Sequence, residues 1–310
     1  MTTRLSIIMP NYNHGNFLEA RIHSIVSQMG PNDELIVVDD GSTDNSISIA
    51  EKFLKREPRF RFIKNPHNLG AERSANIAAN AAQGKYLTWL ATDDRLLPGF
   101  IDETMKVLTE NPDIGLCCSD CAMTFDGYPD KIPDKIYTTR LIETATKTLI
   151  FRPKDIVKIF RTTHFWIPGH TTIAKRELIL KNGGYRENLR YLGDWFLVHS
   201  IALQAGAAYI PKELAAWRQE KKCRSNEQRE DPSVAKQCQW NIFNTLKIEK
   251  NGNLHKLFRK SGLLDFYARQ TLERLWKDPY HWSFILRLTK KYLLFRWKKY
   301  IWKSNRPYGF

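Results

Sequence analysis

The sequence predicts an α/β fold, with a mostly parallel central sheet, helices on both faces and a helical extension at the C-terminus. Apolar, strand-like runs alternate with helical segments up to about residue 90, which is typical of a parallel sheet covered by helices. The run from Glu34 to Val38 is the clearest, because a continuous apolar run is typical of a strand buried on both faces. From about Ser233 onward, the pattern is helical and aromatic.

Each predicted element follows from a local pattern. Leu5 to Met9 is a short β-branched run that stops at Pro10, and Asn16 to Gln28 has apolar residues at helical spacing. Gly84 is expected to end the alanine-rich helix that precedes it. The other strands are expected at Arg59 to Lys64, at Tyr86 to Leu90 and around Cys117. The other helices are expected at Asn45 to Lys55, Arg73 to Gln83, Lys154 to Phe160 and Trp195 to Ala205.

Composition narrows the class of protein. The chain has 310 residues and 42% hydrophobic content, which is enough for a globular core. No stretch reaches the roughly 18 apolar residues of a membrane-spanning helix. The N-terminus lacks the features of a signal peptide, so we expect a cytoplasmic protein. Cys117, Cys118 and Cys121 are interpreted as buried, reduced thiols, because no second Cys-x-x-Cys pair accompanies them to form a metal site.

Positive charge is concentrated at the C-terminus. Net charge is +15, and residues 251–310 hold 14 Lys and Arg against three Asp and Glu. Tryptophans are interleaved with these cations, as in helices that lie in a membrane surface. Ile285, Leu288, Tyr292 and Phe295 fall on one helical stripe, which could instead pack on the rest of the protein. We favour an anionic membrane surface as the partner, and no recognition fold for nucleic acid is apparent.

Polar clusters follow three of the predicted strands, at Asn11 to Asn13, at Asp39-Asp40 and at Asp93-Asp94. Ligands of parallel sheets bind beyond the carboxyl ends of the strands. Adjacent carboxylates suit Mg²⁺ or Mn²⁺, which bind one or two carboxylates together with phosphate oxygens and water. The alternative for Asp94 is a helix N-cap. The convergence of acids at neighbouring strand ends favours a metal–nucleotide site.

These motifs together resemble the inverting family 2 glycosyltransferases with a GT-A fold. The resemblance covers roughly residues 4–218, and the segment Val37-Val-Asp-Asp-Gly-Ser-Thr-Asp44 is its most specific part. The sequence departs from the family where Ala91 and Thr92 precede the acid pair, and where Gly193 precedes Asp194. The other matching segments are Ser6 to Asn13, Asn68 to Gly70, Thr92 to Asp94 with Pro98, Gly183 to Tyr185 and Gly193 to Trp195.

The resemblance implies a role for each site residue. Asp194 is implied as the general base that deprotonates the acceptor hydroxyl, with a helix cap as its alternative role. Asp40 is expected to accept a hydrogen bond from a uracil or thymine imide. Asp93 and Asp94 share the metal and ribose contacts. The other nucleotide-binding residues are Pro10, Tyr12 and Arg73, with a place on the helix surface as the alternative for Arg73. Possible donor or acceptor contacts are His170, Trp195 and Arg218. The alternatives are a surface-loop histidine for His170 and a solvated arginine for Arg218.

The resemblance implies a metal-dependent inverting glycosyltransferase. It is expected to transfer a sugar from a nucleotide-diphosphate sugar, UDP or dTDP favoured, to a hydroxyl of a glycan or lipid-linked glycan in cell-surface polysaccharide synthesis. The alternatives are a sugar-phosphate nucleotidyltransferase and an inactive membrane-associated scaffold. Residues 1–232 are the expected catalytic domain, with a nucleotide-binding half (1–98) and an acceptor-binding half (99–232). Residues 233–310 form the extension, on the inner face of the cell membrane.

Overall fold

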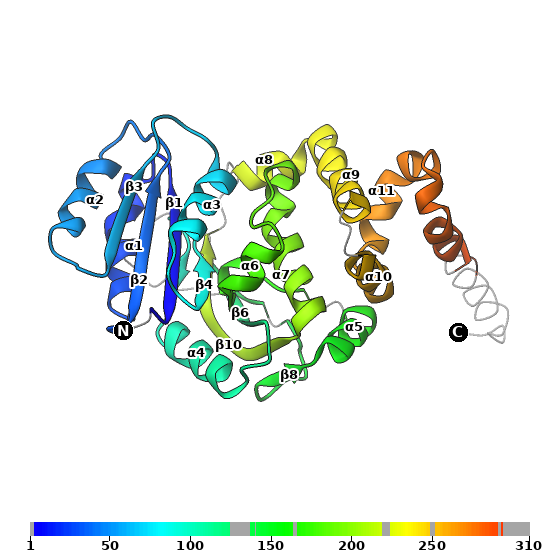
Figure 1. Ribbon diagram of the computed structural model, residues 1–310, viewed down its shortest axis with the longest axis horizontal. Coiled ribbons are helices and arrows are strands. Elements are labelled where there is room, and N and C mark those ends of the chain that lie inside the picture. The colour runs from blue at the N-terminus through cyan, green and yellow to red at the C-terminus, as the bar shows by residue number, and fades with distance from the viewer. Residues whose placement is uncertain are drawn as a thin grey trace, which may run out of the picture.

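A computed structural model describes residues 3–124, 137–139, 141–163, 166–218, 224–248, 252–290 and 293. Its centre is a mixed sheet in the order β3-β2-β1-β4-β9-β6-β10-β5, to which β7 and β8 add by pairing with β6 and β10 (Figure 1). The strands are β1 Leu5–Asn11, β2 Asp33–Asp39, β3 Phe60–Lys64, β4 Tyr86–Trp89, β5 Arg95–Leu96, β6 Leu116–Thr124, β7 Tyr137–Thr139, β8 Leu149–Phe151, β9 Ile173–Lys175 and β10 Ala207–Arg218.

Helices connect and cover these strands. The α-helices are α1 Gly15–Val26, α2 Ser46–Leu54, α3 Ala71–Ala81, α4 Phe100–Glu110, α5 Pro153–Thr162, α6 Arg176–Lys181, α7 Gly193–Ala205, α8 Arg224–Glu230, α9 Pro232–Ile248, α10 Gly252–Ser261 and α11 Asp265–Trp276. Residues 282–290 are also helical. The 3-10 helices are η1 Gly169–Thr171, η2 Glu187–Leu192 and η3 Pro279–His281.

The N-terminal half of the sheet is parallel throughout. β1 pairs in parallel with β2 and β4, and β2 pairs in parallel with β3. β9 runs antiparallel to both β4 and β6 and joins this half to the parallel pair of β6 and β10. Because β1, β2 and β4 are parallel neighbours, the polar clusters that follow them lie at one edge of the sheet.

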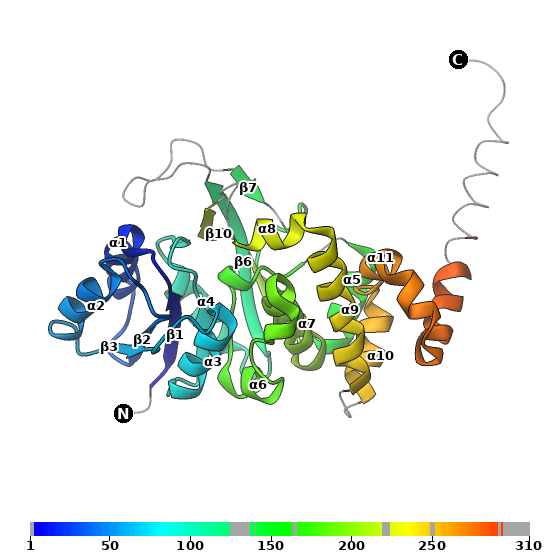
Figure 2. The same cartoon turned by 90° about the horizontal axis from the view of Figure 1, so that it is seen from above.

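The two faces of the sheet carry different sets of helices (Figure 2). Leu5, Ile7 and Met9 of β1 share one core with α1, α2 and α4, whereas Ile8 belongs to the core formed with α3, α5, α6 and α7. Successive side chains of a strand point to opposite faces, so one apolar strand serves both layers. The predicted α/β fold with helices on both faces is therefore confirmed.

Gly84 does not end α3 as a left-handed glycine. The helix ends at Ala81, and Ala82, the next residue, is already extended. A Cβ on Gly84 would lie 2.5 Å from the backbone nitrogen of Ser6. Glycine is needed at position 84 because the chain passes close to β1 there. The prediction that Gly84 ends the helix is wrong, because the helix has already ended at Ala81.

The C-terminal helices are packed against the rest of the chain. Phe258 of α10 stacks on Phe196 of α7, with ring centroids 5.4 Å apart. Ile285 is buried and Leu288 packs against the same core, so the start of the predicted stripe faces inward. Tyr292 and Phe295 lie outside the described residues. Within the described part of the chain, no helix combines the length and the apolar character needed to span a bilayer.

Candidate active site

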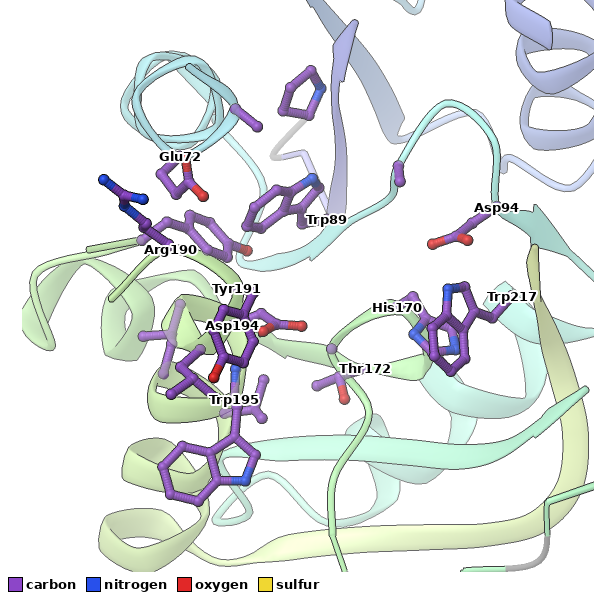
Figure 3. Close-up of a pocket in the computed structure, with 18 of the residues that line it drawn as sticks. Glu72, Trp89, Asp94, His170, Thr172, Arg190, Tyr191, Asp194, Trp195 and Trp217 are labelled. Atoms are coloured by element: carbon purple, nitrogen blue, oxygen red, sulfur yellow. The ribbon is translucent and has the colours of Figure 1, made fainter. Parts of the chain in front are cut away.

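A cavity of about 1070 Å³ opens at the carboxyl ends of the parallel strands and extends across to α7. Figure 3 shows Asp94, His170 and Trp217 at one end, Glu72 and Arg190 at the other, and Asp194 between them. The cavity brings together most of the predicted site residues: Pro10, Tyr12, Asp40, Asp93, Asp94, His170, Asp194, Trp195 and Arg218.

Asp40 is the buried carboxylate at the end of β2. Its Oδ1 accepts hydrogen bonds from Asn65 Nδ2 at 2.8 Å and from the Leu69 backbone N–H at 2.9 Å. Its Oδ2 accepts one hydrogen bond, from the Gly70 N–H at 2.8 Å. A carboxylate oxygen can accept two donors, so Oδ2 retains capacity for one more. The neighbouring Asp39 instead organises the loop, accepting hydrogen bonds from Asn11 and Ser42.

The acid pair Asp93-Asp94 lies in the loop after β4, separated from the end of the strand by three residues. Asp94 is 7% exposed and accepts a hydrogen bond from the backbone N–H of Arg218. Burial raises the pKa of Asp94 well above its usual range, and the charge of Asp93 raises it further. Gly99 caps α4, the next helix, so Asp94 is not a helix N-cap. A buried carboxylate with a raised pKa, such as Asp94, is stabilised in its ionised form by a nearby cation.

Arg21 supplies one such cation from the back of the acid loop. It lies on the buried face of α1, is 4% exposed, and donates from Nε to the Thr92 carbonyl oxygen at 3.1 Å. Burial lowers the pKa of Arg21 to about 10, and the charges of Asp94 and Asp93 oppose that shift. The guanidinium therefore holds the loop that carries the acids and offsets part of their charge.

The donor set fits a divalent cation whose other ligands come from the substrate. No cluster of three or more His, Cys, Asp and Glu side chains suited to a metal occurs in the described ranges. Mg²⁺ and Mn²⁺ are commonly held by one or two carboxylates plus phosphate oxygens and water. Asp93 and Asp94 match that set, and the raised pKa of Asp94 indicates a site where additional positive charge is favourable.

Asp194 faces the middle of the cavity from the first turn of α7 (Figure 3). Its Oδ1 accepts a hydrogen bond from the Trp195 N–H at 2.6 Å, and Leu192 occupies the N-cap position. Burial raises the pKa of Asp194, with a smaller contribution from Glu72. A carboxylate with a raised pKa is a stronger base, which suits proton abstraction near neutral pH.

Gly169 leaves the space that Asp194 occupies. A Cβ at position 169 would lie 2.6 Å from Asp194 Oδ2 and 3.1 Å from Asp194 Cβ. The turn η1 can approach the carboxylate this closely only because residue 169 has no side chain. The sequence analysis did not identify this glycine.

His170 lies beside Asp94 and Trp217 (Figure 3). Its Nε2 is 2.9 Å from Cys121 Sγ, and its ring centroid is 6.1 Å from that of Trp217. Burial lowers the pKa of His170 to about 4, whereas burial raises the pKa of Cys121 to about 12. The pair is therefore a neutral imidazole and a neutral thiol, and Cys121 is a buried reduced cysteine as predicted.

The structure distinguishes among the remaining predicted residues. Arg218 lines the cavity and its guanidinium lies 4.5 Å from the ring centroid of Phe17. The indole of Trp195 points away from the span between Asp94 and Asp194 (Figure 3). Arg73 does not line the cavity, and its Nε donates to Glu187 at 3.1 Å. The nucleotide contact predicted for Arg73 has no support in this geometry, because the guanidinium is engaged at the surface.

Sequence patterns missed several residues of the site. Arg21 carried a usable signal, because a charged residue stands on the apolar face formed by Leu18, Ile22 and Ile25. Arg190 carried none, since its position depends on how η2 meets α9. Glu72 and Tyr191 also line the cavity.

Comparison with known proteins agrees with this fold. TarS of S. aureus (residues 1–349, in complex with UDP-GlcNAc) superposes with a TM-score of 0.66 at 16% identity, covering 86% of this chain and 72% of that one. A mannosyltransferase from Pyrobaculum calidifontis, in complex with GDP-Man and Mn²⁺, superposes with a TM-score of 0.57 at 17% identity, covering 98% and 84%. The molecule thus has the GT-A fold.

The model of the family "Glycosyl transferase family 2" matches residues 6–179, and the chain belongs to that family. TuaG of Bacillus subtilis, whose name assigns it provisionally to teichuronic acid biosynthesis, is 32% identical over 124 residues, or 40% of this chain and 46% of that one. The uncharacterized glycosyltransferase YibD of Escherichia coli is 30% identical over 182 residues, covering 58% and 51%. The chain spans about half the length of these curated relatives.

Proposed function

We propose that this protein is a metal-dependent inverting glycosyltransferase. It moves a sugar from a nucleotide-diphosphate sugar, UDP or dTDP favoured, to a hydroxyl of a glycan or lipid-linked glycan in cell-surface polysaccharide synthesis. Family membership supports sugar transfer over the nucleotidyltransferase alternative. The name of TuaG supports the polysaccharide context. The inactive-scaffold alternative is disfavoured because Asp93, Asp94 and Asp194 all line the cavity.

One observation carries the proposal: a single cavity holds the acid pair of half-buried Asp93 and buried Asp94 at one end and a separate half-buried carboxylate, Asp194, in its middle. Transfer with inversion needs positive charge at the leaving diphosphate and a base on the opposite face of the sugar. The separation of Asp93-Asp94 from Asp194 along the cavity suits this division of roles. Residues 1–98 then contribute most of the nucleotide side, and residues 99–232 contribute the base and most of the acceptor side.

The residues perform distinct tasks in this reaction. Asp93 and Asp94 would hold Mg²⁺ or Mn²⁺, which neutralises the departing diphosphate. Arg218, at the end of β10, positions the Asp94 carboxylate through its backbone N–H. Asp194 accepts the proton of the acceptor hydroxyl as that oxygen bonds to the anomeric carbon. Its raised pKa makes it a better base than an exposed aspartate.

Asp40 Oδ2 is the proposed contact for the base of the donor. Asp40 lines the cavity and its Oδ2 can accept one more hydrogen bond, which the imide N–H of uracil or thymine can donate. The structural neighbours were solved with different nucleotides, UDP-GlcNAc in TarS and GDP-Man in the mannosyltransferase. Proteins of this fold therefore differ in the nucleotide that they bind, and a binding measurement decides the preference of this chain.

Calorimetric titration of UDP, dTDP and GDP with Mn²⁺ tests the proposal. We expect UDP or dTDP to bind more tightly than GDP, and Asp94→Ala to weaken Mn²⁺-dependent binding by at least about tenfold, the loss of one charge-assisted contact of about 1.4 kcal/mol. Asp102→Ala is the matched control, on an exposed acid of α4 outside the cavity. Tighter binding of GDP than of both pyrimidine nucleotides, or full Mn²⁺-dependent binding by Asp94→Ala, contradicts the assignment.

A further inference from the structure

A second hollow of about 620 Å³ adjoins the catalytic cavity between η2, α9 and α11. Arg190 lines both hollows, so the two hollows meet at this residue. In Figure 3, Arg190 lies at the end of the catalytic cavity away from Asp94, with its guanidinium directed away from Asp194. A chain-like acceptor whose reacting hydroxyl sits at Asp194 could therefore continue past Arg190 into the second hollow.

The lining of this second hollow is rich in side-chain amides. Arg274 donates to Gln237 Oε1 at 2.8 Å, Gln237 Nε2 donates to Asn241 Oδ1 at 2.9 Å, and Asn241 Nδ2 donates to the Asn188 carbonyl oxygen at 2.6 Å. Each amide is held in a fixed orientation by this chain. An amide nitrogen carries two donors, and within the described residues the Gln237 and Asn241 nitrogens each use one of them. Oriented amides of this kind suit hydrogen bonding to sugar hydroxyls.

The hollow also carries excess positive charge. Arg190 and Arg274 line it, and neither has an ion-pair partner among the residues that the structure describes. The acid of the lining, Glu187, is paired with Arg73 at 3.1 Å. Asp231 lies within electrostatic range of Arg190, but its carboxylate accepts three hydrogen bonds from Ser233 and Val234. The two arginines are thus available to an external anion.

The backbone at Arg190 is strained. Its φ of 47° and ψ of −126° interrupt η2, and a non-glycine residue adopts such a conformation only when its surroundings enforce it. This conformation sets the direction of the Arg190 side chain at the junction of the two hollows. Strained residues of this kind cluster at functional sites.

We propose that the second hollow is an acceptor subsite for an anionic glycan, in which Arg190 and Arg274 bind a carboxylate or phosphate group and the amides bind neighbouring hydroxyls. This inference rests on the proposed glycosyltransferase function and names the acceptor class. An acceptor of this kind is a polymer with a negative charge at intervals, from uronic acid residues or from phosphodiester links. The arginines hold the acceptor a few sugars away from the reacting hydroxyl.

Binding of defined oligosaccharides to the full chain tests this proposal without knowledge of the donor sugar. The probes are a uronic acid hexasaccharide, the same hexasaccharide after carboxyl reduction, and a phosphodiester-linked sugar oligomer of similar length. We expect a charged oligomer to bind at least about tenfold more tightly than the reduced one, since a charged contact contributes roughly 1.5–3 kcal/mol. The preferred charged oligomer identifies the anion as carboxylate or phosphate.

Three variants locate the binding site. Arg274→Gln and Arg190→Gly should each lose on the order of tenfold in affinity for the charged oligomer, with little change for the reduced one. Arg190→Gly relieves the strained backbone, so it should stay folded. Arg56→Gln is the matched control, because Arg56 is exposed after α2, at the opposite side of the molecule from α9 and α11 (Figure 1).

Equal binding of the charged and reduced hexasaccharides by the wild-type chain, together with no preference for the phosphodiester oligomer, overturns the proposal. Wild-type affinity in Arg274→Gln and Arg190→Gly also overturns it. Titration of UDP with Mn²⁺ on the same samples tests the proposed glycosyltransferase function separately from the acceptor subsite. If UDP binds and no charged oligomer is preferred, the subsite is wrong while the proposed function stands. If the charged oligomer binds at the arginines and no nucleotide binds, the proposed function fails alone.

Discussion

Asp194 and Gly169 are the residues whose chemistry is most tightly fixed by the structure. The Asp194 carboxylate is half-buried, has a raised pKa and accepts a hydrogen bond from the Trp195 N–H. The space beside its Oδ2 exists because residue 169 is glycine. The position of the Asp194 carboxylate therefore depends on the lack of a side chain at residue 169.

Replacing Asp194 with Asn removes the basic oxygen while preserving shape. Because a general base contributes roughly 10²–10⁴-fold to rate, Asp194→Asn should lose at least about a hundredfold in kcat. Its melting temperature and donor affinity should stay near those of the wild type. Steady-state kinetics, calorimetry and thermal unfolding on the same variant measure the three quantities. Near wild-type turnover would move the base elsewhere, with His170 the next residue to test.

Gly169→Ala is expected to act through Asp194. The new methyl group would meet the carboxylate well inside contact distance, so the side chain must rotate out of place. We expect kcat to fall by about 10-fold or more, in line with the sensitivity of catalysis to displacements of about 1 Å, with nucleotide affinity unchanged. Gly30→Ala is the control, since a Cβ there has its nearest atom at 3.3 Å. Unchanged turnover in Gly169→Ala would mean that catalysis does not require the close approach of η1 to Asp194.

At the scale of elements, the C-terminal helices divide their apolar side chains between two surfaces. Ile285 and Leu288 pack inward. Large side chains on the other side of α11 and of residues 282–290 are exposed: Leu272, Trp276, Trp282 and Leu286. Trp282 Nε1 donates to the Trp276 backbone carbonyl oxygen at 2.9 Å, which holds the Trp282 indole against the end of α11. With the positive charge of residues 251–310, this face suits an anionic membrane surface.

Vesicle binding tests that face. Trp276→Ser combined with Trp282→Ser should weaken binding to vesicles containing anionic lipid by at least about tenfold, since burial of a large apolar side chain contributes about 1.5–3 kcal/mol. Added salt should weaken it further because screening reduces the attraction of exposed charges. Leu54→Ser, on an exposed leucine at the end of α2, is the control. Equal sedimentation of all three proteins with anionic vesicles would reject the tryptophan face.

At the scale of the whole molecule, buried histidines link stability to pH. Burial lowers the pKa of His170, His199, His255 and His281 to about 4. The unfolded chain, with histidine pKa values near 6.5, binds protons that the folded protein excludes. The stability from neutral histidines is therefore complete above about pH 6.5 and falls as pH decreases toward 4.

We expect the melting temperature to decrease between about pH 6.5 and 4. His281→Leu should reduce this dependence, because neither ring nitrogen of His281 has a hydrogen-bond partner among the described residues and the ring packs against aromatic side chains. His67→Leu, on an exposed histidine, is the control. Thermal unfolding at several pH values measures the slope, and an identical slope in wild type and His281→Leu would exclude His281 as a contributor.

Local sequence signals predicted the fold better than they predicted the site. The strands that begin at Leu5 and Asp33 are buried and therefore apolar along their length. This apolar pattern lies within each strand, so both strands could be found from the sequence. Arg73 was expected either to contact the nucleotide phosphate or to lie on the surface of its helix, and in the structure it pairs with Glu187. Arg190 and Arg274 meet in space only because η2, α9 and α11 pack together. Contacts between distant segments of this kind leave no local pattern.

The stack of Phe258 on Phe196 has a consequence for cooperativity. It ties α10 to α7, the helix that carries Asp194, and Phe243, Leu275 and Phe284 belong to the same buried cluster. The C-terminal helices and the catalytic half should therefore unfold in one transition, as a single cooperative unit. A chain cut before α10 would expose Phe196 and loosen the helix that holds the base. The helices proposed to bind the membrane and the half that carries the catalytic base should therefore lose their structure together.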